Sequence, residues 1–495
     1  MTTAAVEALG YGASYVCLVP DTASQAQEEG MKVRSPRRSS QRLKVSTVAL
    51  TLVAFAGLLA STGSATAQDS HYWGQQYGPR ASLLSGAVIG SVGDISGTFY
   101  NPGALGIADE LAFAISTDVY EYESITIEDG AGEGIDLGTT KSGVRPSLLA
   151  GTLTRSLFGQ DVLAYSVLTR ARSSSDISTE IVRSGAEIPP ELDLDELVGV
   201  GRVDGQFNET WVGLSYAHPF SSSFGLGVTG YVAHRTQRRR TEGVVEAIAQ
   251  DGSTYVDINL RGGNYSSFRT LAKIGGYFAS ESFSAGLTFT TPSLHITGSG
   301  EFGINEAVFT SDTTVLLATL QPDLSATYKS PLSVGLGFGW QIGKARVNAS
   351  GEWFDKIDPY VVMQGEESIQ QEPPQPITFD VVQSMDEVFN WGLGLEYAFK
   401  ETFSGYASFA TDASGFTDEV ERADLSLNTL DLYSAFLGAD FRVSSARLTV
   451  GLGYGWGSAP APQLTDILPG DEAEVDPKYV YSRFRILFGF ELGVD

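Results

Sequence analysis

The clearest pattern in the C-terminal half of the chain is an alternation of large apolar side chains with small or polar ones. One segment carries apolar residues at Leu332, Val334, Leu336, Phe338 and Trp340, separated by Ser333, Gly335, Gly337 and Gly339. The same pattern recurs in residues 391–399 and 448–456. A period of two predicts strands with two different faces. A soluble sandwich turns its large side chains inward, whereas a membrane barrel turns them toward lipid.

Alternation and turn residues together predict about 14 strands. Their expected spans are 110–122, 145–156, 161–172, 207–218, 222–248, 253–278, 282–297, 330–341, 344–356, 388–399, 402–411, 429–442, 445–456 and 479–492. The long gaps between them fall at 123–144, 173–206, 298–329, 357–387, 412–428 and 457–478, and the intervening gaps are short. Short turns on one side and long loops on the other are typical of transmembrane β-barrels. We therefore predict an all-β, antiparallel transmembrane barrel over residues 109–495.

The last strand indicates which face meets lipid. Phe484, Ile486 and Phe488 share one face, and Arg483 and Arg485 share the other. An arginine facing lipid near the bilayer centre costs about 2–4 kcal/mol. The charged face is therefore predicted to line the lumen. The charges expected there are Arg447, Arg483, Arg485 and Glu396.

One predicted hairpin is longer than a membrane requires. Its turn is Asp251-Gly252, a dipeptide that favours two-residue hairpin turns. The consecutive residues Arg238, Arg239 and Arg240 lie on its outgoing arm. They are either a solvated charge run or a contact for the phosphates of surface lipopolysaccharide.

The first 67 residues are expected to direct export. Residues 31–67 resemble a secretory signal, with basic residues after Met31, an apolar run over 48–60 and the cleavage pattern Ala65-Thr66-Ala67. Residues 1–30 precede this better start and are expected to be a mis-assigned extension. The apolar run is shorter than the roughly 20 residues of a membrane helix. Export combined with β periodicity predicts the outer membrane of a Gram-negative type cell.

Composition excludes several classes of function. The formal net charge is -27, which disfavours binding to nucleic acid. The single cysteine, Cys17, precedes the expected cleavage site, so neither thiol catalysis nor a thiolate metal site is expected. The four histidines have no metal-binding spacing, and no nucleophile signature accompanies them. We expect no cofactor, no metal and no enzymatic activity.

Residues 68–108 precede the first predicted strand. Leu83, Leu84, Ala87, Val88 and Ser91 have helical spacing, and glycine and proline interrupt the rest. The segment is too apolar for a disordered tail and too broken for a strand. It is predicted either to fill the lumen or to pack beneath the barrel.

The end of this segment resembles the FadL/TodX family of outer-membrane transporters for long-chain fatty acids and other hydrophobic compounds. The resemblance rests on Asp94 followed by Phe99-Tyr100-Asn101-Pro102 just before the first strand. Gly103 stands where the family's Asn-Pro-Ala signature has alanine. The resemblance implies an N-terminal hatch inside a monomeric 14-stranded barrel. It also implies capture of an apolar ligand by outer loops and passage when the hatch shifts.

The expected loop at 298–329 contains apolar residues that are candidates for ligand capture, namely Val315, Leu316, Leu317 and Leu320. An exposed apolar cluster is a liability unless it binds something. The alternative is that these residues pack against neighbouring loops. At the level of function, the alternative is a general porin or a surface adhesin that transports no apolar ligand.

Overall fold

The computed structural model describes residues 71–108, 113–129, 136–154, 160–185, 188, 193–310, 314–416, 430–460 and 478–493. Within these ranges, no helix has the length and apolarity needed to cross a membrane. The expected signal segment 31–67 and the extension 1–30 lie outside the described residues.

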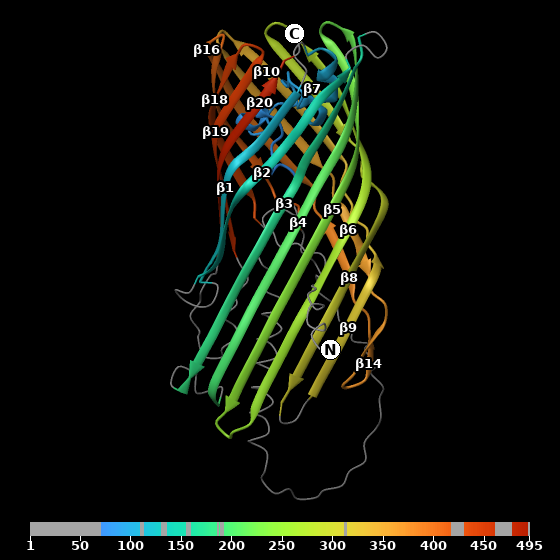
Figure 1. Ribbon diagram of the computed structural model, residues 1–495, viewed down its shortest axis with the longest axis vertical. Coiled ribbons are helices and arrows are strands. Elements are labelled where there is room, and N and C mark those ends of the chain that lie inside the picture. Colours follow the sequence, from blue (N-terminus) through green and yellow to red (C-terminus); the bar gives the residue numbers. More distant parts are fainter. Residues whose placement is uncertain are drawn as a thin grey trace, which may run out of the picture.

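The described strands form a closed antiparallel barrel of 14 strands with two further strands attached, which confirms the predicted strand number (Figure 1). Pairing of β5 with β6 closes the ring. The barrel strands are β1 (Phe113–Glu128), β2 (Leu137–Thr154), β3 (Val162–Ser184), β4 (Leu194–Ser221), β5 (Phe224–Ala249), β6 (Thr254–Ala279), β7 (Phe283–Thr290), β10 (Ser333–Ile342), β11 (Ala345–Phe354), β16 (Val388–Lys400), β17 (Phe403–Asp412), β18 (Leu432–Val443), β19 (Ala446–Pro460) and β20 (Lys478–Leu492).

The two faces of the barrel wall differ in polarity: the outer face carries exposed apolar side chains, and the inner face carries small and charged residues. On β20 the side chains of Phe484, Ile486 and Phe488 are exposed on the outside, whereas Arg483 and Arg485 are buried. The apolar residues of β10 and β19 are likewise exposed between buried glycines. The small-residue face therefore points into the barrel.

Strands β3 to β6, which have 23 to 28 residues each, continue far beyond the other strands of the ring, toward the bottom of Figure 1. β4 alone has 28 residues, whereas a strand needs about 9–11 to cross a bilayer. The expected loop at 173–206 is largely strand instead, because β3 and β4 keep their register out to Ser184 and Glu196. The predicted Asp251-Gly252 turn joins β5 to β6, and Gly252 has a φ of 79°.

Two predictions about the next segments are wrong. The strand expected over 282–297 ends at Thr290, because Pro292 follows and cannot donate a ladder hydrogen bond. The expected loop at 298–329 forms β8 (Leu294–Phe309) and β9 (Thr314–Ser325) instead. β8 pairs with the outer part of β6, and β9 pairs with β8.

The connection from β11 to β16 also contains strands. They are β12 (Ile357–Gln364), β13 (Ser368–Gln370), β14 (Gln375–Ile377) and β15 (Asp380–Met385). Tyr360 and Met363 of β12 pack with Tyr265 and Tyr328 in one apolar cluster. This connection is therefore attached to the side of the extended sheet that carries Tyr265.

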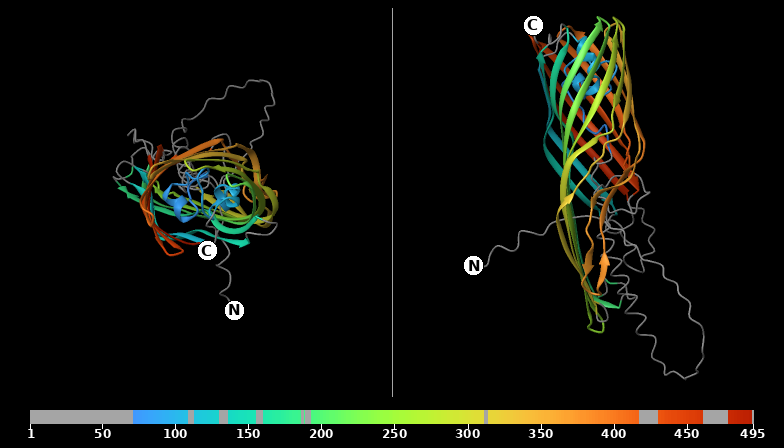
Figure 2. Two further views of the ribbon diagram at one scale, coloured as in Figure 1. Left: turned by 90° about the horizontal axis from the view of Figure 1, so that it is seen from above. Right: turned by 90° about the vertical axis from the view of Figure 1, so that its right-hand side faces the viewer.

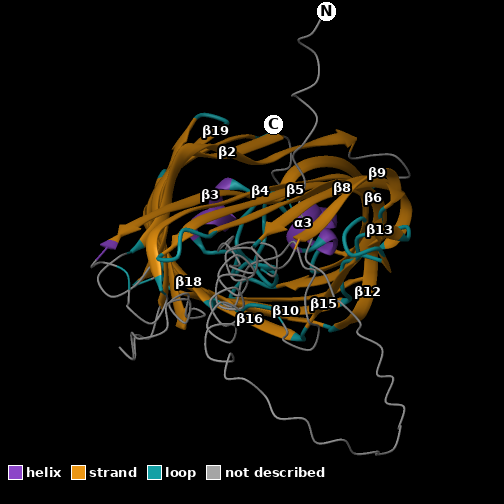
Figure 3. Ribbon diagram, turned by 90° about the horizontal axis from the view of Figure 1, so that it is seen from below, coloured by secondary structure: helices purple, strands orange, loops and turns teal. Residues whose placement is uncertain are grey.

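The amino-terminal segment (residues 71–108) lies within the ring of strands (Figures 2 and 3). It contains α2 (Pro79–Leu83), α3 (Gly97–Tyr100) and the 3-10 helix η1 (Pro102–Gly106). α2 contacts β18 and β20, whereas η1 contacts β4, β5 and β6. The segment thus touches opposite sides of the barrel. The helix expected through Ser91 ends at Leu83, since Ser85 and Gly86 have positive φ values of 51° and 79°.

The inner glycines of the wall allow the backbone of this segment to approach closely. A Cβ atom at Gly103 would lie 2.6 Å from the carbonyl oxygen of Gly275 and 2.7 Å from that of Gly225. A Cβ atom at Gly337 would overlap the backbone of Gly90. The alanine of the Asn-Pro-Ala signature therefore does not fit at position 103. The alternation of glycine along the strands provides the surface on which the segment packs.

Adjacent glycines of β6 provide a test of this packing. A Cβ atom at Gly275 would overlap Asn101 Oδ1, whereas at Gly276 the nearest atom is a flexible Leu226 methyl 3.2 Å away. We predict that Gly275→Ala destabilises the protein by about 1–3 kcal/mol through overpacking. Gly276→Ala should unfold at nearly the wild-type temperature. Equal shifts of the thermal midpoint in the two variants would contradict the packing described.

A buried carboxyl group in the extended sheet makes its stability depend on pH. Burial raises the pKa of Asp257 to about 6. The hydrogen bond from the Tyr255 hydroxyl lowers this pKa, but its effect is smaller than that of burial. A raised folded-state pKa means that the folded sheet binds a proton more tightly, so stability is gained below pH 6 and lost as the pH rises through 6. Amides of the β5–β6 hairpin should exchange more slowly at pH 5 than at pH 7.5, after correction for the intrinsic rate. Asp257→Asn should remove this difference; its persistence would exclude Asp257 as the cause.

Candidate functional site

Asn101 joins the amino-terminal segment to the barrel wall. Its side chain is fully buried. The amide nitrogen donates to the carbonyl oxygens of Ile89 and Gly276, each at 3.1 Å. The amide oxygen accepts from the Gly103 N–H at 3.1 Å, which caps η1 next to Pro102. One side chain therefore begins the 3-10 helix and attaches it to β6.

The other residues of the predicted motif lie around α3. The Asp94 carboxylate accepts the Ser96 N–H at 2.8 Å. The Tyr100 hydroxyl accepts the Tyr77 N–H at 3.1 Å. The ring of Phe99 packs on that of Tyr77, with 4.3 Å between their centroids. Asp94 and Tyr100 thus stabilise the fold of the segment, and Phe99 also lines a cavity above it.

Charged wall residues hold the segment from several sides. Arg80 is paired with Glu396 at 2.8 Å. Arg483 donates to the Gly74 carbonyl at 2.7 Å, and Arg485 donates to the Gln76 side chain at 2.9 Å. Arg447 pairs instead with Asp440 and Glu491 on the neighbouring wall strands, each at 3.3 Å. Three of the four predicted lumen charges therefore contact the segment.

Two carboxylates bind the beginning of the segment. Asp412 accepts the backbone N–H groups of Tyr72 and Trp73 at 3.1 and 2.8 Å. Glu352 accepts the indole N–H of Trp73 at 3.0 Å and the Ser333 hydroxyl at 2.7 Å. These bonds position the segment where it forms the floor of the cavity.

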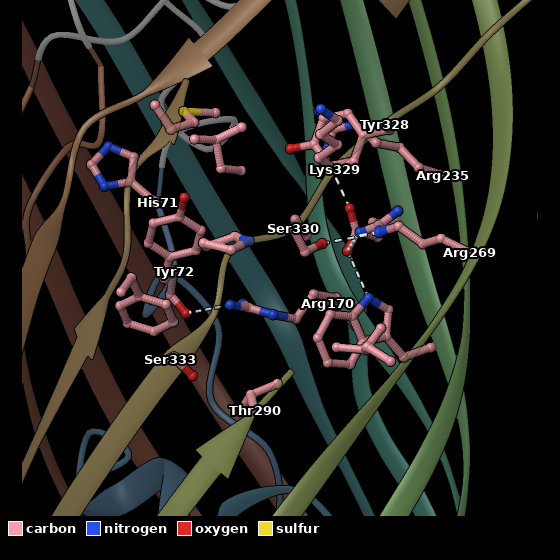
Figure 4. A pocket seen from close by; sticks show the side chains of 18 of the residues that line it. His71, Tyr72, Arg170, Arg235, Arg269, Thr290, Tyr328, Lys329, Ser330 and Ser333 are labelled. Carbon is pink, nitrogen blue, oxygen red and sulfur yellow. Dashed lines mark hydrogen bonds and ion pairs between the residues drawn. The ribbon is translucent and has the colours of Figure 1, made fainter. Parts of the chain in front are cut away.

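The cavity lies between this floor, strands β3 to β7, and the connections after β9 and β11 (Figure 4). His71, Tyr72 and Phe99 come from the segment, and Ile357 and Met385 come from the connection between β11 and β16. The volume accessible to water is about 60 Å³. Pockets for drug-sized ligands measure about 300–1,000 Å³. A ligand of that size requires the lining to move.

Glu209 is the centre of a buried ionic network at the wall of the cavity. It accepts from Arg269 at 2.5 Å, from Arg235 at 3.2 Å and from the Trp211 indole at 2.6 Å. The Arg269 guanidinium also lies 4.8 Å from the ring centre of Tyr328. One carboxylate thus serves two guanidinium groups.

Cations exceed carboxylates in the cavity lining. Arg170, Arg235, Arg269, Lys273 and Lys329 line it, against Glu209 and Glu352. The Nη1 nitrogen of Arg269 is buried without a hydrogen-bond partner in the described part of the chain. A buried donor without a partner costs about 1–3 kcal/mol, more when it is charged. The lining can therefore accept an additional anionic group.

The barrel wall is incomplete beside this cavity. β2 pairs with β3 only between Leu148↔Leu168 and Thr154↔Leu163. Further out, β2 continues along β1, and β3 continues along β4. Among the described residues, no pairing joins β2 to β3 in this outer part. Val144 on β2 exposes 60% of its surface, which places an apolar side chain next to the gap.

The candidate capture residues do not form a loop. All four lie on β9, where Leu316 and Leu320 are exposed and Val315 is half-buried. Leu317 is buried in a cluster with Phe302, Leu324 and Phe379. None of the four lines the cavity described above. Val315 packs at the edge of another apolar cluster, near Val308.

The arginines of the outgoing β5 arm are mostly neutralised by neighbours. Arg238 lies 3.5 Å from Asp204, and Arg240 pairs with Glu242. The side chain of Arg239 is buried. The outer surface of the sheet at this level therefore carries little excess positive charge.

Sequence reasoning missed the charged residues of the cavity as a group. Arg170, Glu209, Arg235 and Arg269 come from four different strands, and only the register of β3 to β6 brings them together. Single-strand alternation marks each as inward-facing but does not show that they meet. Asp412 was missed because it ends a strand, where alternation gives no further information.

Together these features define an antiparallel barrel with an internal segment and a polar cavity beside a gap in the wall. No protein-family model and no curated protein sequence matches the chain. Several solved structures share its fold. The P. putida toluene transporter TodX aligns with 85% of this chain and 99% of its own, at 11% identity and a TM-score of 0.54. A Pseudomonas aeruginosa FadL homologue aligns over 85% and 99%, at 12% identity and a TM-score of 0.52.

The Ralstonia pickettii toluene transporter TbuX aligns with 84% of this chain and 99% of its own, at 10% identity and a TM-score of 0.50. The predicted resemblance to FadL and TodX is therefore confirmed at the level of the fold.

Proposed function

We propose that the protein is an outer-membrane channel for the uptake of hydrophobic compounds that carry a carboxylate, such as long-chain fatty acids. The observation that carries this proposal is the cavity, whose lining combines an unpartnered Arg269 nitrogen with more cations than carboxylates and lies beside a gap in the wall. The shared fold with a FadL homologue and two toluene transporters supports the apolar part of the ligand.

The amino-terminal segment acts in this proposal as a hatch. Its contacts with β18 and β20 on one side and with β4, β5 and β6 on the other, together with its buried residues, support a segment that fills the lumen between opposite walls. A ligand enters from the side of the extended strands, with Leu316 and Leu320 of β9 as candidate capture residues. The cavity is too small for a long acyl chain until the lining shifts. The gap between β2 and β3 then offers a lateral exit into the membrane.

The energetics favour a ligand with both parts. Each methylene removed from water contributes roughly 0.8 kcal/mol. A hydrogen bond between charged groups contributes about 1.5–3 kcal/mol in a buried site. An acyl chain therefore provides affinity, and the carboxylate provides orientation toward Arg269. A sugar or a simple ion has no acyl chain and therefore lacks the contribution to affinity that comes from burying methylenes.

The remaining parts of the proposal concern the cellular setting. Residues 31–67 direct export, and the mature chain acts as a monomer in the outer membrane of a Gram-negative type cell. The extended strands face the cell surface, and the solvent-accessible Arg238 and Arg240 are the candidate contacts for lipopolysaccharide. A general porin is disfavoured because buried residues of the segment occupy the lumen. A surface adhesin would use the extended strands and would leave uptake unchanged.

The test compares laurate with dodecanol, which has the same acyl length and no charge. In cells that lack the native protein, expression of the full chain should restore uptake of laurate. Arg269→Ala should raise the dissociation constant for laurate about tenfold or more and change that for dodecanol much less. The ratio of the two constants is insensitive to a general loss of folded protein.

An exposed arginine provides the control. Arg202 pairs with Asp176 on the outer surface, far from the cavity lining, so Arg202→Ala should leave both constants unchanged. Equal losses for laurate and dodecanol in Arg269→Ala would contradict carboxylate recognition by Arg269. Uptake of laurate that does not depend on the protein at all would favour the porin or adhesin alternative.

A further inference from the structure

Arg170 lies where the cavity, the amino-terminal segment and the wall gap meet. Its side chain lines the cavity (Figure 4). The Arg170 Nη2 group donates to the Tyr72 carbonyl at 2.8 Å. The Tyr77 hydroxyl donates to the backbone carbonyl of Arg170 at 3.0 Å. Arg170 follows Leu168, the last residue of β3 that pairs with β2, by two positions.

The backbone of β3 explains this position. In the ladder with β4, Thr169 pairs with Thr210 and Ala171 pairs with Glu209, so Arg170 is the extra residue of a bulge. A bulge bends the strand and redirects the side chain. The guanidinium of Arg170 lies over two rings inside the barrel, 5.9 Å from the centre of Phe99 and 5.5 Å from that of Trp211.

The hydrogen-bond acceptors of Arg170 are neutral, unlike those of its neighbours. They are the Tyr72 carbonyl and, at 3.5 Å, the Tyr77 hydroxyl. Arg235 and Arg269 bind the Glu209 carboxylate, and Lys273 lies 3.5 Å from Glu352. Charge-assisted hydrogen bonds are roughly twice as strong as neutral ones. A carboxylate that enters the cavity can therefore displace the Tyr72 carbonyl from Arg170 more readily than it can displace Glu209 from Arg235 or Arg269.

We propose that Arg170 is a ligand-operated latch, which holds the start of the amino-terminal segment against β3 until an anionic ligand takes its guanidinium. Once Arg170 turns to the ligand, the Tyr72 carbonyl loses its hydrogen bond to β3 beside the gap, whereas the Tyr77 hydroxyl keeps its bond to the Arg170 backbone carbonyl. The start of the segment around Tyr72 is then loosened on the side where the wall is open, while Tyr77 still anchors it to β3. This inference rests on the proposed function, because it requires an anion in the cavity.

Arg483 provides a matched control. It also donates to a segment carbonyl, that of Gly74, at 2.7 Å. It does not line the cavity, and its strand β20 is paired on both edges, with β1 and β19. Its loss should loosen the segment without affecting the response to ligand.

The test is hydrogen exchange of the full chain in lipid nanodiscs, followed for peptides that cover residues 71–78. In the wild type, laurate should accelerate exchange of these peptides several-fold, and dodecanol should not. Arg170→Ala should show fast exchange without ligand and no further response to laurate. In Arg483→Ala, the same peptides should exchange faster than in the wild type without ligand, and laurate should still accelerate their exchange.

Laurate affinity, measured on the same preparations, separates the two proposals. Binding of laurate to the wild type without faster exchange of residues 71–78 would overturn the latch and leave the proposed function standing. A laurate response of wild-type size in Arg170→Ala, or equal responses to laurate and dodecanol, would also overturn it. Absence of laurate binding would overturn both.

Discussion

The structure depends on close backbone contact between the amino-terminal segment and the glycine face of the barrel wall. Gly103 lies against the carbonyl oxygens of Gly225 and Gly275, and Gly90 lies against Gly337. Side chains at these positions would push the segment away from the wall. Since interiors are densely packed, even one methyl group is felt there. The alternation of large and small residues therefore produces the barrel and the surface that holds its contents.

The cavity exists because the segment has this position. Phe99 and Tyr72 form its floor, and Asp412 and Glu352 fix the residues around them. The surrounding strands add more cations than carboxylates. The irregularities of the wall occur at the same level, with a bulge at Arg170 and the end of the β2–β3 ladder at Leu148. The cavity lining, the contacts of the amino-terminal segment and the end of the β2–β3 ladder therefore share a few neighbouring residues.

Much of the fold could be predicted because a period of two is a local signal. The strand number and the inward position of Arg483 and Arg485 both follow from it. The motif around Asn101 indicated a special segment, and the structure places that side chain at its junction with the wall. The broken helix at Ser85 and the extra strands β8 and β9 were not predicted. Positive φ at a serine and pairing between distant strands leave no clear local pattern.

The cavity could not be predicted because its lining combines residues from strands whose register is set by the whole barrel. The extra residue at Arg170 lets both Arg170 and the adjacent Ala171 line the cavity, which simple alternation would not predict. The unpartnered nitrogen of Arg269 likewise depends on how three strands share Glu209. Such features follow from the closure of the barrel rather than from any one strand.

The proposed function requires the amino-terminal segment to move when an apolar anion passes. Ala87 Cβ lies 3.3 Å from the Cβ position of Gly392 on β16, and a shift of a few tenths of an ångström brings this pair to the roughly 3.5–4.5 Å between the Cβ atoms of a disulfide. A protein with Ala87→Cys and Gly392→Cys can therefore be locked by oxidation and released by reduction. The account predicts that laurate uptake stops in the oxidised protein and returns after reduction. Uptake at the same rate in both states would contradict it.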